Sequence, residues 1–133
     1  MNALGSALYS KLSGTAITSL LGGTYVYNLQ APEGQALPYI VFSTQGGGDN
    51  NESPHRVKDL VIFVRAYSGI SAGQAGSIDA QIDTALHMSP LTVTGWSDLW
   101  LAREQDLETV ENPQSGKPVW MAGGMYRVLL EKT

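Results

Sequence analysis

The segment from Leu60 to Tyr67 constrains the fold of this chain more than any other part of its sequence. Its first five residues, Leu-Val-Ile-Phe-Val, are all apolar, so both alternating sets of side chains are apolar. β-Branched and aromatic residues favour strands. A strand that is apolar on both sides is typical of one covered on both faces of a sheet. We therefore predict a central strand here, covered on both faces.

Two further strands are expected before it. Pro38 fixes its own φ and biases Leu37 towards extended geometry, so it suits the start of a strand that runs to Thr44. The short segment Tyr25–Tyr27 is β-prone and predicts an edge strand. Residues 45–58 contain three glycines, two asparagines and a proline, with no anchoring hydrophobic residue until the last positions. This composition predicts a long, mobile hairpin loop.

The last third of the chain is predicted to be β-structure, with strands at residues 91–96, 99–105 and 119–131. The turn-forming segment 111–118 contains two prolines, an asparagine and a glycine, and it predicts a hairpin between the last two strands. Gly123-Gly124 interrupts the final strand. It predicts a β-bulge or a sharp bend there.

Three helices are expected. Apolar residues at helical spacing predict the first at residues 4–12, and a second short one at residues 15–21 is stopped by Gly22-Gly23. Ser71 and Gln74 have the spacing of a capping box and begin the third, which runs to Pro90. Its apolar stripe consists of Ala72, Ala75, Ile78, Ile82, Ala85 and Leu86, with Asp79, Gln81 and Asp83 on the opposite, solvent-facing side.

The order of these elements predicts an α+β fold, a single domain over residues 1–133 with two or three helices packed on a mainly antiparallel sheet. A chain of this size buries about two-thirds of its surface, which is enough for one core. The N-terminal residues show no basic region followed by an apolar run. We therefore expect neither a signal peptide nor a membrane span.

The charge and cysteine content exclude several kinds of site. Cysteine is absent, which excludes disulfides and thiolate metal sites. The formal net charge of −4 gives no broad electrostatic reason to hold phosphates tightly. Only 15% of the residues are charged, which leaves more apolar surface than a monomer needs and favours an oligomer.

No residue pattern indicates catalysis, a cofactor or a metal. The histidines are His55 and His87, and only Asp83 lies at helical spacing from His87, whose position in a last helical turn is explained by the helix dipole. The glycines after Gln45 resemble a phosphate loop, but the Asp49 that follows repels phosphate. We therefore predict no catalytic, cofactor-binding or metal-binding residue.

Two clusters in the β-rich last third leave alternatives open. The acidic cluster is either a solvated strand edge or a surface of complementary charge for a partner; it consists of Asp98, Glu104, Asp106, Glu108 and Glu111. The aromatic cluster is either core packing or interface anchoring; it consists of Trp96, Trp100, Trp120 and Tyr126. Our candidate interface residues are Asp49, Asn50, Arg56, Lys58, Trp96, Trp100, Glu111, Lys117 and Trp120.

The order of short motifs along the chain resembles the phage tail-completion, or tail-terminator, family of head–tail joining proteins. The matching motifs are Ala3-Leu4, Ala7-Leu8, Gly22-Gly23, Ala31-Pro-x-Gly34, Leu37-Pro-Tyr-Ile40, Val61-x-Phe63-x-Arg65-x-Tyr67, Ala85-Leu86 and Met125-Tyr-Arg-Val-Leu129. The last third, with Trp96-Ser-Asp-Leu-Trp100 and the acidic hairpin, departs from any pattern of that family.

The resemblance implies a structural virion protein. Such a protein assembles in the host cytoplasm into a homo-oligomeric ring, typically a hexamer, at the junction of tail and head. The ring caps the tail tube protein, ends tail polymerisation and offers a face to a head-side connector or stopper protein, while DNA passes through its lumen without tight binding. The alternatives are a head-side connector or another neck adaptor protein, and a small enzyme or ligand-binding α+β domain.

Overall fold

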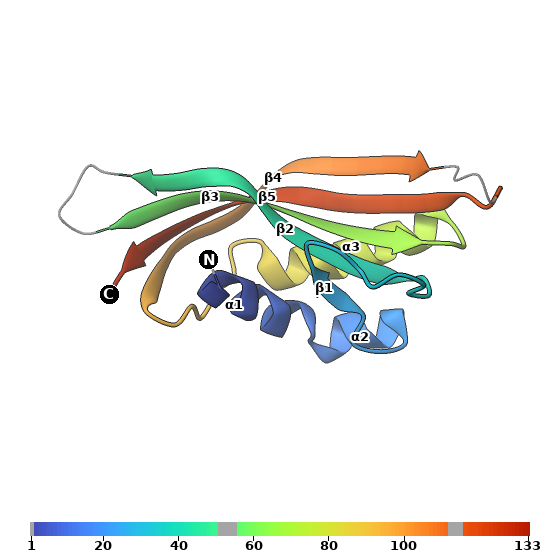
Figure 1. Cartoon of the computed structure of the whole chain (residues 1–133), viewed down its shortest axis with the longest axis horizontal. Coiled ribbons are helices and arrows are strands. Elements are labelled where there is room, and N and C mark those ends of the chain that lie inside the picture. Colours follow the sequence, from blue (N-terminus) through green and yellow to red (C-terminus); the bar gives the residue numbers. More distant parts are fainter. Residues whose placement is uncertain (1, 51–55, 112–115) are drawn as a thin grey trace.

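The computed structural model of the chain describes residues 2–50, 56–111 and 116–133, with Asn50 described by its backbone alone. These residues form one sheet and three helices, and the helices all lie on the same side of the sheet (Figure 1). The helices are α1 (Asn2–Leu12), α2 (Thr15–Leu21) and α3 (Ala72–Leu86). The strands are β1 (Val26–Asn28), β2 (Tyr39–Asn50), β3 (Val57–Ser68), β4 (Trp96–Glu111) and β5 (Val119–Lys132). The predicted α+β fold is confirmed.

The strand order in the sheet is β1-β2-β3-β5-β4, so β3 is central as predicted. All neighbouring strands are antiparallel except β1, which runs parallel to β2. β1 is a short edge strand, which the sequence predicted, and β4 forms the other and much longer edge. The C-terminal ends of β2 and β4 lie at opposite ends of the molecule (Figure 1).

The hydrophobic core lies between the helices and one face of the sheet. Leu60, Ile62 and Val64 of β3 are almost fully buried there. Val61 and Phe63 point to the other face and are only half-buried. The prediction that this strand is covered on both faces is therefore wrong, because α1, α2 and α3 all pack on the same side (Figure 1).

Much of the predicted loop at residues 45–58 is regular sheet. β2 continues to Asn50 and β3 begins at Val57, so only residues 51–55 of the prediction fall outside the described residues. A register shift between Thr44 and Gly46 absorbs one residue as a β-bulge. A Cβ on Gly47 would lie 2.0 Å from a carbonyl oxygen of β3, so glycine is required for this pairing. Cross-strand hydrogen bonding thus outweighs the low β-propensity of the glycines.

The last third differs from the prediction at two places. Residues 91–95 form a loop with one isolated bridge rather than a strand, and only Leu91 and Val93 of this loop are buried. The β-bulges lie in β4, between Asp98 and Trp100 and between Arg103 and Gln105, whereas β5 pairs with β3 without interruption through Gly123-Gly124. The predicted hairpin of the last two strands is confirmed by their antiparallel pairing. Residues 112–115 lie outside the described residues.

The helix boundaries follow the predicted signals. Gly22 ends α2 in the left-handed conformation with φ of 80°. The hydroxyl of Ser71 accepts the backbone N–H of Gln74 at 3.1 Å and begins α3. The second half of the predicted capping box is absent, because the Gln74 side chain accepts the hydroxyl of Ser68 instead. Ser68 thereby ties the end of β3 to the start of α3.

Candidate functional site

The face of the sheet away from the helices is an apolar surface that the three helices leave uncovered (Figure 1). Half-buried side chains that alternate with the buried ones on β2, β3 and β5 point to it. We call it the open sheet face; it is formed by Tyr39, Val41, Val61, Phe63, Arg65, Tyr67, Met121, Met125 and Leu129. Exposed apolar patches of this breadth are rare on monomers and mark contact surfaces.

Three tyrosines form a ladder across one end of the open sheet face. The rings of Tyr27 and Tyr39 meet edge to face at 6.3 Å, and those of Tyr39 and Tyr67 lie 5.3 Å apart. Such pairs stabilise neighbouring strands. Burial, together with the nearby Glu111 carboxylate, raises the pKa of Tyr39, and burial raises the pKa of Tyr67. Both phenols therefore stay neutral and the face keeps its apolar character.

The charges on the open sheet face are few. Asp59 and Arg127 form a two-point ion pair across β3 and β5, with distances of 2.8 Å and 2.5 Å. The hydrogen bond from Arg127 lowers the pKa of Asp59. The guanidinium of Arg65 lies over the ring of Phe63, 4.7 Å from its centroid. Among the described residues, no carboxylate forms a salt bridge with Arg65.

A buried ion cluster on the helix side was not predicted. Arg103 of β4 donates to both carboxylate oxygens of Asp79 in α3, at 2.9 Å and 2.7 Å, and to the carbonyl oxygen of Gly123 at 2.6 Å. The carboxylate of Asp83 lies 3.9 Å from Nη1 of Arg103. The prediction that the Asp79 side of α3 faces solvent is therefore wrong. The signal was available: two aspartates one helical turn apart, and an arginine on a half-apolar strand.

The surroundings of Arg103 keep it charged. Burial alone would lower the pKa of Arg103, but hydrogen bonds and charge interactions with Asp79 and Tyr126 together raise it. Burial raises the pKa of Tyr126. A Cβ on Gly124 would lie 2.7 Å from the guanidinium, so this glycine makes room for Arg103. The cluster is a structural link between α3 and the edge strand.

The predicted interface residues divide between the two ends of the sheet. At one end, the Asp49 carboxylate lies 3.5 Å from Arg56 and 3.2 Å from Lys58. Lys58 also lies over the ring of Trp96, which packs partly against the core, and the backbone of Asn50 ends β2 beside them. The structure therefore brings this subset together.

The remaining predicted residues lie elsewhere. Glu111 and Trp120 occupy the far end of the β4–β5 pair, where Trp120 is half-buried opposite Val110, and exposed Lys117 precedes β5. Trp100 lies on β4 opposite Leu129 and is 42% exposed. The role of all these residues in subunit contacts stays a prediction.

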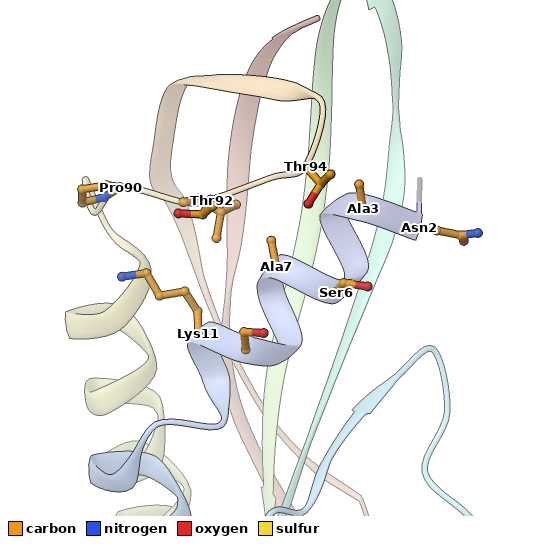
Figure 2. Close-up of a pocket in the computed structure, with 10 residues that line it drawn as sticks. Asn2, Ala3, Ser6, Ala7, Lys11, Pro90, Thr92 and Thr94 are labelled. Atoms are coloured by element: carbon orange, nitrogen blue, oxygen red, sulfur yellow. The ribbon is translucent and has the colours of Figure 1, made fainter. Parts of the chain in front are cut away.

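A groove of about 660 Å³ separates α1 from the loop before β4 (Figure 2). Ala3 and Ala7 point across it towards Thr92 and Thr94, and Lys11 extends towards the loop near its Pro90 end. Lys11 is the one titratable residue among those that line it. The groove offers no pair of groups for acid–base chemistry.

The side chains of His87 and Asp106 both accept hydrogen bonds from Arg103. His87 ends α3, and its Nδ1 accepts the backbone N–H of Arg103 at 3.0 Å, while Asp106 accepts Arg103 Nε at 2.7 Å. Within residues 2–50, 56–111 and 116–133, no cluster of three His, Asp or Glu side chains could hold a metal ion. In the same part of the chain, no helix is long and apolar enough to span a membrane.

Residues 6–115 match the sequence profile of the family described as tail completion protein gp17. The fold is similar to that of a chain in the virion of a native gene transfer agent particle, with a TM-score of 0.79, 18% identity, and coverage of 98% of this chain and 96% of that one. It is also similar to bacteriophage SPP1 gp17 protein, with a TM-score of 0.58, 18% identity, and coverage of 99% and 90%. No curated protein matches in sequence.

Proposed function

This chain belongs to the tail completion protein gp17 family, and we propose that it caps the tail tube of a phage-like particle as a ring of copies. The ring ends tail polymerisation and joins the tail to the head. Family membership and the likeness to virion proteins support a structural role in tail completion. The observation that carries the ring is the open sheet face, a broad apolar surface that the chain's own helices leave uncovered.

The ring acts through its shape and its contacts and catalyses no reaction. A head-to-tail contact between copies repeats the same rotation and closes around one axis. One rim of the ring then meets the last ring of the tail tube, and the other rim meets a connector or stopper protein of the head. The absence of paired titratable groups in the groove beside α1 supports this structural role over the enzyme alternative.

DNA passes through such a ring without being held tightly. Four of the eight Lys and Arg residues are already paired with carboxylates: Arg56, Lys58, Arg103 and Arg127. The net charge of −4 per copy multiplies with copy number. We expect a shallow salt dependence and dissociation constants of about 10⁻⁴ to 10⁻⁶ M for duplex DNA. Tight binding with a steep salt dependence would instead indicate a DNA-gripping connector.

The experiment uses tail tubes assembled from the tube protein of the same particle. Added protein should place a ring of density at one tube end in electron micrographs and stop further elongation, whereas an unrelated acidic protein of similar size should do neither. Monomers bound singly at tube ends would contradict the ring. Binding to the head-side portal assembly but not to tubes would favour the alternative of a neck adaptor.

A further inference from the structure

We propose that a second copy of this chain docks on the open sheet face, with Arg65 meeting the acidic edge of β4 from that second copy. The acidic edge is formed by Glu104 and Glu108, both exposed; Asp106 between them is already paired with Arg103 of its own chain. This inference rests on the proposed ring and names the surface and the charged groups through which its copies join.

The size of the open sheet face fits a specific contact. Three strands about 4.8 Å apart and nine residues at about 3.3 Å each give a projected area of roughly 430 Å². Lattice-type contacts bury less than about 400 Å² per partner, and standard interfaces bury about 800 Å². The accessible surface of the whole chain is 7292 Å², above the roughly 6,800 Å² expected for a compact monomer of this mass.

The charges on the open sheet face favour a second copy as its occupant. Of its carboxylates, Asp59 is neutralised by Arg127 on the same face, and Glu111 lies at the tyrosine end, close enough to act on Tyr39 and Tyr67. Arg65 has no carboxylate partner within the described residues and is held over Phe63. Two acidic copies repel each other unless their contact joins opposite charges. The chain carries the matching negative charge itself, on the outer edge of β4.

β4 also offers apolar side chains to such a contact. Leu99, Trp100 and Val110 are 52%, 42% and 48% exposed and all lie on this strand. The loop after α3 hydrogen-bonds to Leu101 and Arg103, so it covers only the first half of the β4 edge. The acidic second half stays open in the described part of the chain. Edge strands of this length are protected in nature by charge or by a partner.

The two surfaces are different, so the contact is head-to-tail. A symmetric contact of one open sheet face with another would place like charges from the two Arg65 residues together and would stop at a dimer. When the open sheet face of one copy binds the β4 edge of another, the pair still has one unoccupied open sheet face and one unoccupied β4 edge. Copies therefore add until the rotation closes.

The test reverses the charges and measures mass by native mass spectrometry and light scattering over a concentration series. Arg65→Glu should raise the concentration for half-assembly at least about tenfold. A Glu104→Lys, Glu108→Lys variant should do the same. Combining the three substitutions should restore assembly. Lys11→Glu on α1 is the control, because it makes the same charge change away from both surfaces. Circular dichroism and melting curves verify that each variant is folded.

The outcomes separate the two proposals. A wild-type chain that stays monomeric, alone and on tail tubes, overturns the ring and with it the proposed function. Wild-type rings that persist unchanged in Arg65→Glu overturn only the docking surface. Equal weakening by Lys11→Glu would assign the effect to net charge and overturn the surface as well. Failure of the combined variant to recover assembly would overturn the partnership of Arg65 with the acidic edge.

Discussion

Arg103 of β4 and Asp79 of α3 form a two-point ion pair, with the two guanidinium nitrogens 2.9 Å and 2.7 Å from the two carboxylate oxygens. Their side chains are only 11% and 15% exposed. The pair bridges 24 positions of sequence and links the edge strand to the helix layer. It holds the strand on which we place the acidic edge.

Removing one member of this pair should be costly. Arg103→Met leaves the Asp79 carboxylate buried without compensation, and we expect a loss of about 3–5 kcal/mol in the free energy of unfolding. Arg103→Met combined with Asp79→Leu should recover part of that loss, because neither charge remains. Asp106→Asn is the control, since that side chain is 84% exposed and should change stability by less than about 1 kcal/mol. Urea denaturation measures all of these values, and an additive double variant would contradict the coupling.

Two glycine substitutions should act in opposite directions. A Cβ on Gly123 would lie 2.2 Å from the carbonyl oxygen of Val64, so Gly123→Ala forces β3 and β5 apart and should destabilise the fold by about 1–3 kcal/mol. Gly76 lies within α3 and has open space around it. Gly76→Ala should therefore stabilise the fold by about 0.5–1 kcal/mol. Thermal melts compare the two variants, and equal effects would refute this account of Gly123.

Removing the hydroxyl of Ser68 should destabilise the fold more than removing that of Ser71, the N-cap residue of α3. The fully buried hydroxyl of Ser68 accepts the backbone N–H groups of Ile70 and Ser71, at 3.1 Å and 3.3 Å. Ser68→Ala leaves both donors unsatisfied and should cost about 1–3 kcal/mol, whereas Ser71→Ala should cost about 1 kcal/mol. Exposed Ser77, within the same helix, provides a near-neutral alanine control. The prediction fails if Ser68→Ala unfolds at the same urea concentration as Ser77→Ala.

Acid should weaken the open sheet face by protonating Asp59. The pKa of this carboxyl is lower in the folded chain than its ordinary value of 3.8, chiefly through the hydrogen bond from Arg127. A lowered folded pKa contributes stability above the unfolded pKa, and this contribution is lost as pH falls through the folded pKa. Asp59→Asn should therefore reduce the slope of melting temperature against pH below about pH 4. If the melting temperature of Asp59→Asn fell with pH below about pH 4 as steeply as that of the wild type, this role of Asp59 would be contradicted. Glu131→Gln is the control, and it should keep the wild-type slope.

The alternation and spacing of apolar residues were sufficient to predict most elements. Residues 60–67 specified the central strand, residues 4–12 specified α1, and Ser71 specified the start of α3, because these signals are local and depend on backbone geometry and capping. The resemblance in motif order was also sufficient for the family, which the match over residues 6–115 confirms.

Long-range pairing decided what local signals misjudged. The glycines after Gln45 predict a loop, yet β3 supplies a hydrogen-bonding partner along their whole length. Gly123-Gly124 predicts a bulge or a sharp bend in β5, yet the pairing with β3 shows no bulge there, and the glycines serve the close approach of Val64 and Arg103. The β3 partners of the first glycines lie 11 to 15 positions away, from Gly48↔Asp59 to Gly46↔Val61, and Arg103 lies 20 positions from Gly123. A pattern read over a few neighbouring residues reveals neither partner.

The sequence by itself determined the α+β class, the family and the absence of cysteine chemistry. Only the tertiary structure decided which face of the sheet stays open, which aspartates pair with Arg103, and which charges remain free. Those properties depend on the side of the sheet to which each helix crosses. Packing between distant segments decides on which side the helices lie. The sequence of a strand does not show this, because an apolar strand face can pack against a helix of the same chain or against a neighbouring copy.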